Sequence, residues 1–219
     1  AHGYMGKGIF PTLRKYATNI DTLITEGTML NRNDECIHEC KVSEKMANVM
    51  KAFKYVFVLA SATDIERLAS IKNASSEAKK TLYVCSNFMA STMKFFTERE
   101  SSLSRGLFNF SPRMLRLNGL DRIKKKGFVL IAGTSQISRV KKLLKELPIE
   151  ETLLIYSSWE GYYTIPEQIA ANPGYKNFRE LFYNIVDIHT SGHADKTTIK
   201  RVIETINSKE VIVIHKEGN

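Results

Sequence analysis

The sequence is poor in cysteine, with only Cys36, Cys40 and Cys85. An odd and sparse count, without a secretion signal, argues against a disulfide framework and predicts reduced thiols in a cytoplasmic protein. Cys36 and Cys40 flank His38, but at helical spacing His38 points away from both thiols. A structural zinc also needs four ligands, and the sequence holds no second cysteine pair. We therefore interpret Cys36 and Cys40 as residues of a helix face.

Long apolar runs are also absent, since no stretch approaches the roughly 20 residues that span a bilayer. We find no signal peptide, lipidation motif, internal repeat or low-complexity tract, so we expect no membrane partner. The 219 residues are 43% hydrophobic, which is enough to form a core in one large domain or two small ones. Lysine and arginine outnumber aspartate and glutamate, which gives a formal net charge of +9. This charge favours anionic partners such as nucleic acid, although a basic surface that only contacts solvent gives the same composition.

Apolar runs of strand length alternate with amphipathic runs of helix length along most of the chain. The predicted strands are 22–25, 55–60, 82–85, 128–132, 153–156, 185–188 and 211–214. The predicted helices are 34–53, 65–78, 87–97, 137–147 and 195–206, whereas 99–126 and 157–174 are interpreted as irregular. Near-continuous apolar strands separated by helices predict an α/β protein whose mainly parallel sheet is covered on both faces. Sites in such proteins form beyond the carboxyl ends of the strands.

A Ser-Gly-His turn precedes the last predicted helix. At Ser191, Gly192 and His193 several backbone N–H groups converge beside the positive end of a helix dipole, which suits a phosphate oxygen. His193 can donate a proton to a leaving oxygen, because imidazole exchanges protons near neutral pH. The alternative is a histidine that only hydrogen-bonds a loop carbonyl, and this alternative is favoured when the motif is taken alone.

Three further polar residues follow predicted strands. His215 ends the last strand, where an imidazole is a natural zinc ligand or, equally, a partly buried histidine with a protein partner. Glu26 can orient a histidine through a carboxylate–imidazole hydrogen bond, or it can be a solvated loop acid. Ser157 belongs to a Ser-Ser-Trp turn that offers hydroxyls and an aromatic face to a nucleotide, although a lone tryptophan is more often a core or lid residue.

Taken in order, three motifs resemble those of the β-CASP family of metallo-β-lactamase-fold RNA-processing nucleases. Leu23-Ile24-Thr25-Glu26-Gly27-Thr28 is similar to the carboxylate motif that opens a β-CASP cassette. The segment 188–195, with its Ser-Gly-His-Ala core, and the segment 211–217, a strand that ends in histidine, resemble the two motifs that follow. His193 and His215 are 215 − 193 = 22 residues apart, with one helix and one strand between them, as in the short C-terminal segment of this family. The resemblance covers essentially the whole chain.

The resemblance implies an α/β fold in which a Rossmann-like β-CASP cassette with a parallel sheet is inserted into a metallo-β-lactamase αββα sandwich. It divides the chain into a remnant of the lactamase body (1–30), the cassette (31–175) and the C-terminal RNA-metabolising segment of the lactamase body (176–219). The His-x-His-x-Asp-His metal motif of the family is absent from the sequence. Ala1-His2-Gly3-Tyr4 resembles the stretch just past a later bridging aspartate, so we expect the chain to be a fragment of a longer protein.

By its resemblance to RNase J and the cleavage-and-polyadenylation endonucleases, the parent protein is implied to be a zinc-dependent hydrolase of RNA phosphodiester bonds. His215 is implied to bind one of two zinc ions, His193 to donate a proton or stabilise the transition state, and Glu26 to hydrogen-bond His193. The resemblance implies contacts to phosphate for Ser191 and Gly192, and we expect His189 and Ser157 to join them in binding phosphate or RNA. Lys216 follows His215 where a glycine is common, which leaves the choice between exo- and endoribonuclease open.

With one implied ligand, the fragment itself is expected to be inactive and to bind no zinc. RNA is the expected partner, single-stranded DNA is an alternative to it, and a homodimer is the candidate assembly. The rival function is that of a non-catalytic, Rossmann-like module that binds nucleic acid or a nucleotide.

Overall fold

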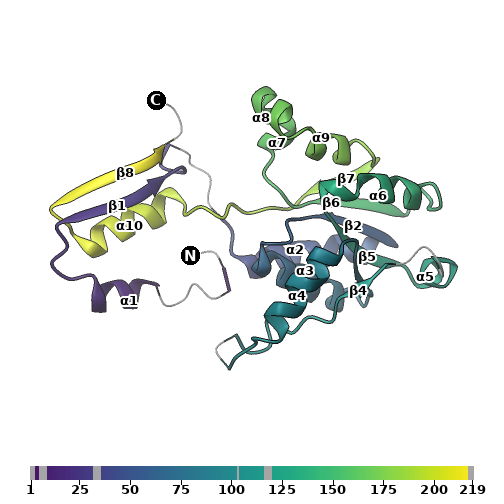
Figure 1. Cartoon of the computed structure of the whole chain (residues 1–219), viewed down its shortest axis with the longest axis horizontal. Helices are drawn as coiled ribbons and strands as arrows, with labels where there is room; N and C mark the ends of the chain where they lie inside the picture. Colours follow the sequence, from purple (N-terminus) through teal and green to yellow (C-terminus); the bar gives the residue numbers. More distant parts are fainter. Residues whose placement is uncertain (1–2, 5–8, 32–35, 103, 116–119, 217–219) are drawn as a thin grey trace. The chain divides into compact units, whose positions relative to one another are not determined.

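The computed structural model describes residues 3–4, 9–31, 36–102, 104–115 and 120–216 (Figure 1). The chain forms two compact units. The larger unit is Cys40–His189, and the smaller unit combines Ala1–Glu39 with Thr190–Asn219. Of the residues in the quoted motifs, Ala1, His2 and Glu217 lie outside the described ranges.

The unit boundaries differ from the expected divisions after residues 30 and 175. They fall after residues 39 and 189. The second boundary lies later than expected because residues 176–189 complete a helix and add a further strand to the sheet of the larger unit. The C-terminal part of the chain that joins the smaller unit therefore begins only at Thr190.

The larger unit alternates helices and strands. Its elements are α2 (Glu39–Ala52), β2 (Tyr55–Leu59), α3 (Ile65–Glu77), β3 (Leu82–Val84), α4 (Asn87–Thr97), β4 (Arg113–Met114), α5 (Leu120–Lys126), β5 (Phe128–Ala132), η2 (Thr134–Gln136), α6 (Ile137–Leu144), β6 (Thr152–Tyr156), α7 (Gly161–Thr164), α8 (Pro166–Ala171), α9 (Pro173–Arg179) and β7 (Asn184–Asp187). Six strands form one sheet in the order β4-β3-β5-β2-β6-β7, and every neighbouring pair is parallel. The predicted α/β fold with a parallel, Rossmann-like sheet is confirmed.

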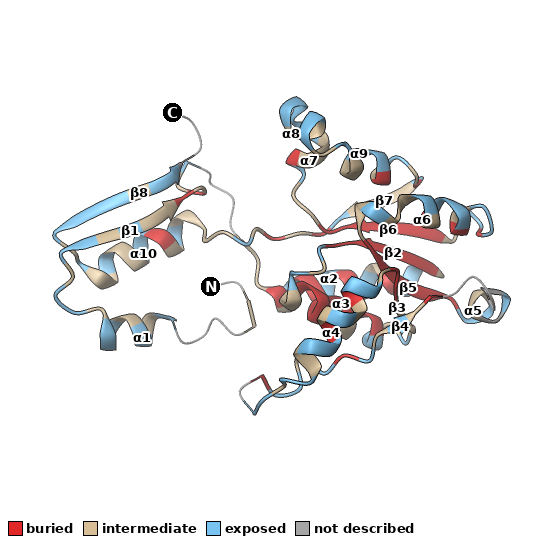
Figure 2. Cartoon of the chain, in the orientation of Figure 1, coloured by how far each residue is buried: buried red, intermediate tan, exposed pale blue. Residues whose placement is uncertain are grey.

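The sheet is covered on both faces because its central strands are apolar on both faces. Every residue of β2, β5 and β6 is buried. From the centre, the chain passes from β2 to β3 and β4 in one direction and from β5 to β6 and β7 in the other. Since parallel crossovers are right-handed, this reversal places α3 and α4 on one face and α6 to α9 on the other. Figure 2 shows the buried residues gathered on the strands and on the sheet-facing sides of the helices.

The two faces are packed with different kinds of side chain. The face under α6 and α9 is rich in aromatic residues and includes Phe57, Phe128 and Phe178. Methionine is frequent among the fully buried residues of the helices before β4, which include Met46, Met50 and Met93. These methionines are therefore core residues, as their helical spacing predicts.

Several helices differ from their predicted positions. The helix expected at 34–53 begins at Glu39, and Asp34 lies outside the described ranges. The stretch 157–174, interpreted as irregular, holds α7 and α8 and the start of α9. Pro166 and Pro173 stand at the start of α8 and α9, where proline lacks only an N–H that has no helical partner. These prolines initiate helices instead of ending them.

The smaller unit contains α1 (Ile9–Tyr16), β1 (Thr22–Gly27), α10 (Lys196–Ile206) and β8 (Glu210–Lys216). The strands β1 and β8 pair in parallel, from Thr22 opposite Glu210 onward. The helix α10 between them begins at Asp195, whose Oδ1 accepts the Thr198 N–H at 2.7 Å, as an N-cap does. Across the described ranges of both units, no helix has the length and apolar character that crossing a lipid bilayer requires.

The glycine between α5 and β5 offers a test of the packing. Gly127 has φ +71°, and a Cβ there would lie 2.4 Å from the carbonyl oxygen of Lys54. We expect Gly127→Ala to lower the free energy of unfolding by about 3 kcal/mol, because the left-handed backbone costs roughly 1 kcal/mol and the clash with a backbone atom adds the rest. Urea unfolding followed by circular dichroism measures the loss.

Gly106 provides the matched control. It has φ +77°, but no described atom lies within 4 Å of a Cβ built there. Gly106→Ala is expected to cost only about 1 kcal/mol. Equal losses in the two variants would show that the close approach to Lys54 has no effect on stability.

Candidate functional site

Glu26, His193 and His215 come together in the smaller unit. Glu26 lies near the end of β1 and His215 near the end of β8, and because these strands are parallel neighbours their carboxyl ends meet. His193 lies in the turn that leads into α10, two residues before its cap. The three side chains each offer one metal-binding atom, and these atoms all lie within 4.8 Å of one another. The ring centroids of the two histidines are 5.6 Å apart.

A β-bulge positions His215. Glu26 pairs with Ile214, and the next residue, Gly27, pairs with Lys216, so His215 is the extra residue on β8. Its φ of 55° lies in the left-handed region, which residues other than glycine rarely adopt. A bulge re-aims the side chain of the extra residue relative to the alternation of a regular strand. The strained backbone conformation of His215 is therefore associated with the direction of its imidazole, which faces Glu26 and His193.

The Glu26 carboxylate holds the turn that carries His193. Its Oε2 lies 2.5 Å from Nδ1 of His193, and its Oε1 accepts the Ala194 N–H at 3.0 Å. The N–H of His193 donates to Oγ of Ser191 at 3.1 Å, which fixes the turn from within. With an ionised Glu26, Nδ1 carries the proton that is donated, and Nε2 is the ring nitrogen left for other chemistry.

Thr28 connects Glu26 to His215. Its hydroxyl lies 3.3 Å from Oε2 of Glu26 and 3.0 Å from Nδ1 of His215. Both imidazoles thus turn Nδ1 toward the protein, and within the described ranges neither Nε2 has a hydrogen-bond partner. The site is open to solvent, since the side chains of His193 and Glu26 are 45% and 31% exposed.

The electrostatics of Glu26 follow from these contacts. Partial burial raises the pKa of its carboxyl group, but the hydrogen bonds from Ala194 and His193, the charge of His193 and the Thr28 hydroxyl lower it by more. The resulting pKa lies below the ordinary value of 4.5, so the carboxylate is ionised at neutral pH. An ionised Glu26 accepts a hydrogen bond from Nδ1 of His193 and holds the imidazole in one orientation.

The donor set suits part of a zinc site. Imidazole nitrogen is a preferred zinc ligand, and a histidine whose Nδ1–H is held by a carboxylate is the usual arrangement behind such a ligand. Nε2 of His215 and Nε2 of His193 are available, whereas Glu26 already accepts hydrogen bonds with both oxygens. Zinc takes four ligands, so these residues form an incomplete coordination sphere that further donors would have to complete.

Ser191 and Gly192, the other residues predicted in this turn, lie beside His193. The Ser191 hydroxyl accepts the His193 N–H, so it shapes the turn. A Cβ at Gly192 would meet no described atom within 4 Å, so packing within the described chain does not explain the glycine. Their predicted contact with phosphate stays a prediction.

Ser157 and His189 belong to the larger unit and meet at Arg67 instead. Nη1 of Arg67 donates to the Ser157 hydroxyl at 2.6 Å and lies 3.1 Å from Nδ1 of His189. Arg67 is 1% exposed and Ser157 is 5% exposed. The Ser157 hydroxyl is thus directed into the unit, where it stabilises a buried charge. The predicted contacts of Ser157 and His189 with RNA stay predictions.

The sequence prediction did not include Arg67, although a signal was present. At helical spacing Arg67 shares a face with Ile71 and Ala74, both of which are buried. An arginine on the apolar face of a helix is rarely buried without polar partners, so it predicts polar groups nearby.

The lowered pKa of Glu26 gives a test with a definite sign. A carboxyl group whose pKa falls on folding stabilises the native state above its unfolded pKa, and this stability is lost as the pH falls through the folded pKa. In the presence of a chelator, we expect Glu26→Gln to lower the free energy of unfolding by roughly 1 kcal/mol at about pH 7 and by clearly less at about pH 3.5. Urea unfolding at the two pH values measures the difference. A loss that does not change with pH would contradict an ionised Glu26 paired with His193.

Comparison with known proteins supports the fold and goes no further. No protein-family model and no curated protein matches the sequence. Among solved structures, the chain is similar to a protein of unknown function from Enterococcus faecalis V583, with a TM-score of 0.66 and 15% identity over 98% of this chain and 50% of that one. The helicase domain of Pyrococcus furiosus Hef aligns with a TM-score of 0.30 and 13% identity over 96% of this chain and 38% of that one. The chain spans about half the length of the Enterococcus protein, whose likeness shows the α/β fold alone.

Proposed function

We propose that this chain is part of a metal-dependent hydrolase of β-CASP type that cleaves phosphodiester bonds in RNA. The observation that carries the proposal is the convergence of Glu26, His193 and His215. They come from three separate motifs, and Glu26 and His193 are 167 residues apart in the sequence. Short motifs that match by chance have no reason to meet in one place, whereas the motifs of one active site must do so.

In the proposed reaction His215 binds the metal through Nε2. A zinc ion held there would supply positive charge to polarise the phosphate and offset the charge that develops on it. His193 presents its Nε2 to the substrate and donates a proton to the leaving oxygen. Glu26 holds Nδ1 of His193 and stabilises the protonated imidazole, so it acts as a positioning residue.

The exposed surface of the smaller unit is consistent with the proposal that further parts of a larger protein surround this site. The sheet of β1 and β8 has two strands in the described ranges, and sheets of two strands are rarely stable by themselves. Ile24, Ile212 and Ile214 are 62%, 40% and 53% exposed. Apolar side chains that gather on a surface are usually covered in the working protein. In the proposal, the remaining part of a lactamase-type sandwich covers them and supplies the missing ligands.

Zinc binding by the chain itself is the first test of this function. The sequence alone predicts that this chain binds no zinc, but the available Nε2 atoms of His193 and His215 lead us to expect weak binding, visible as shifts of their ring resonances when zinc is titrated into the protein. His215→Ala is expected to weaken this binding at least about tenfold, since it removes a direct ligand. His38→Ala is the control, because His38 lies in the smaller unit but outside the group of three. Zinc affinity that is unchanged in His215→Ala would exclude this residue as a ligand.

Hydrolysis of RNA by the parent protein tests the assigned roles. We expect His193→Ala to lower kcat for single-stranded RNA by about a hundredfold or more, because it removes the proton donor, while the affinity for RNA changes little. This chain alone, with added zinc or manganese, is expected to cleave RNA at no measurable rate, since it holds only part of the metal centre. Unaltered turnover in the His193 variant, or robust cleavage by this chain alone, would overturn these assignments.

A further inference from the structure

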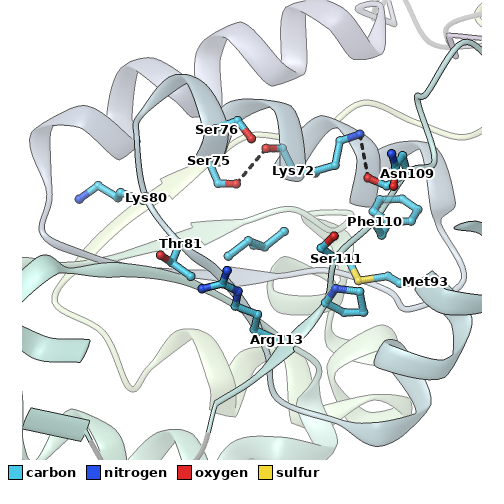
Figure 3. Close-up of a pocket in the computed structure, with 12 residues that line it drawn as sticks. Lys72, Ser75, Ser76, Lys80, Thr81, Met93, Asn109, Phe110, Ser111 and Arg113 are labelled. Atoms are coloured by element: carbon cyan, nitrogen blue, oxygen red, sulfur yellow. Dashed lines mark hydrogen bonds between the residues drawn. The ribbon is translucent and has the colours of Figure 1, made fainter. Parts of the chain in front are cut away.

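An open cleft lies in the larger unit, away from the carboxyl ends of its strands. It is bordered by α3, by the chain that enters β3 and by residues 109–113, which lead into β4 (Figure 3). Its volume is about 330 Å³. Thr81 directly precedes β3 and Arg113 begins β4, so the cleft is located at the amino ends of these strands. It therefore belongs to a different part of the unit from Ser157 and His189, which follow β6 and β7.

The residues that line the cleft are basic or neutral. They include Lys72, Lys80 and Arg113 and no aspartate or glutamate. Lys72 donates to the backbone carbonyls of Gly106 and Leu107 at 3.2 and 2.9 Å, and Lys80 donates to that of Phe53 at 2.5 Å. Carbonyl groups satisfy the N–H donors of the two lysines but leave their charge without a paired anion. The cleft is consequently a region of positive potential.

Both lysines have a lowered pKa, and burial is the main cause. Burial lowers the pKa of Lys72, and the charge of Glu100 offsets only part of the effect. Burial also lowers the pKa of Lys80, and the neighbouring Lys54 adds to the effect. Glu100 is occupied elsewhere, because its carboxylate accepts the N–H groups of Gly106 and Phe108, both at 2.8 Å.

The side chains of Arg113, Ser76, Thr81 and Ser111 are among the polar groups of the cleft that have no hydrogen-bond or ion-pair partner in the described residues. Figure 3 shows Ser76 on α3 and Thr81 and Arg113 on the opposite side of the cleft. A guanidinium opposite hydroxyl groups offers several donors to one anion, an arrangement that matches the oxygens of a phosphate.

We propose that this cleft binds a phosphate group, carried by single-stranded RNA or by a nucleotide, through Arg113 and the hydroxyls of Ser76, Thr81 and Ser111. Phe110, the aromatic residue in the lining, is only 4% exposed, so the cleft offers no open aromatic face on which a base could stack. Binding is therefore directed at the phosphate and is independent of base sequence. The inference does not rest on the proposed hydrolase, because Glu26, His193 and His215 all lie in the smaller unit.

Binding of RNA by the whole chain in the presence of a chelator tests the cleft without any contribution from a metal. The probe is a short oligouridylate labelled with fluorescein, and the readout is fluorescence polarisation. Arg113→Glu is expected to weaken binding by about tenfold and to reduce the slope of log affinity against log salt by about one. Lys142→Glu on α6 is the control, because Lys142 is exposed, changes the net charge equally and lies on the helix that covers the other face of the sheet. It is expected to weaken binding by less than about twofold.

A second variant changes the cleft without changing charge. The double variant Ser76→Ala/Thr81→Val removes two hydroxyls, and we expect about threefold weaker binding with an unchanged circular dichroism spectrum. Uridine monophosphate, titrated against the labelled protein, is expected to shift the backbone amide resonances of Thr81, Ser111 and Arg113. Shifts with the mononucleotide identify the phosphate group as sufficient, and shifts with the oligouridylate alone identify the extended RNA backbone as the ligand.

Two results would overturn the proposal. One is equal weakening by Arg113→Glu and Lys142→Glu, which would mean that only the overall charge attracts RNA. The other is the absence of shifts at these amides with either ligand. Neither result would bear on the proposed metal centre, because both experiments are run with a chelator and that centre lies in the smaller unit.

Discussion

The hydrogen bonds of the Glu26 carboxylate are the interaction on which the candidate site depends. One oxygen holds the imidazole of His193 and the other holds the backbone of Ala194, so a single charged group fixes both the side chain and the turn that carries it. His193 is about half exposed, and little else among the described residues would hold its ring in one orientation. Because both oxygens are engaged, Glu26 works through His193 and is poorly placed to contact a substrate itself.

The backbone of β8 contributes the second constraint. A regular strand would alternate Ile214 and His215 between the two faces of the sheet, whereas the bulge lets His215 depart from this alternation. The left-handed φ of His215 costs free energy, and Thr28 helps to compensate by contacting both the ring and the carbonyl of His215. The larger unit contains a comparable arrangement at Arg67 on α3, a buried charge that contacts Ser157 and His189 just past the ends of β6 and β7.

Much of the larger unit could be predicted from the sequence, because its central strands are uninterrupted apolar runs. The predicted range 128–132 coincides with β5, and those for β2 and β6 differ by one residue. The short helices between residues 161 and 179 were missed, since proline breaks a helix in its interior but favours its first turn, and the sequence alone does not say which position it occupies. The expected division after residue 175 comes from the family resemblance, whereas the larger compact unit runs to residue 189 because β7, predicted as a strand at 185–188, pairs with β6.

For the candidate site, the sequence indicated that Glu26 and His215 follow strands, and parallel pairing explains why they meet. It could not indicate the bulge at His215, because a single left-handed residue depends on the register of the partner strand. Nor could it predict that Ser157 and His189 meet at Arg67, which is 90 and 122 residues away from them in the sequence. Contacts of that range are set by the order of strands in the sheet, which local patterns do not encode.

The central claim is that Glu26, His193 and His215 form one half of a metal centre. Anomalous scattering at the zinc absorption edge, from crystals of the parent protein, tests it most directly. The account predicts a peak at bonding distance from Nε2 of His215, with Glu26 hydrogen-bonded to Nδ1 of His193 beside it. A fully occupied zinc ion elsewhere in the protein, with His215 turned away from it, would contradict the account.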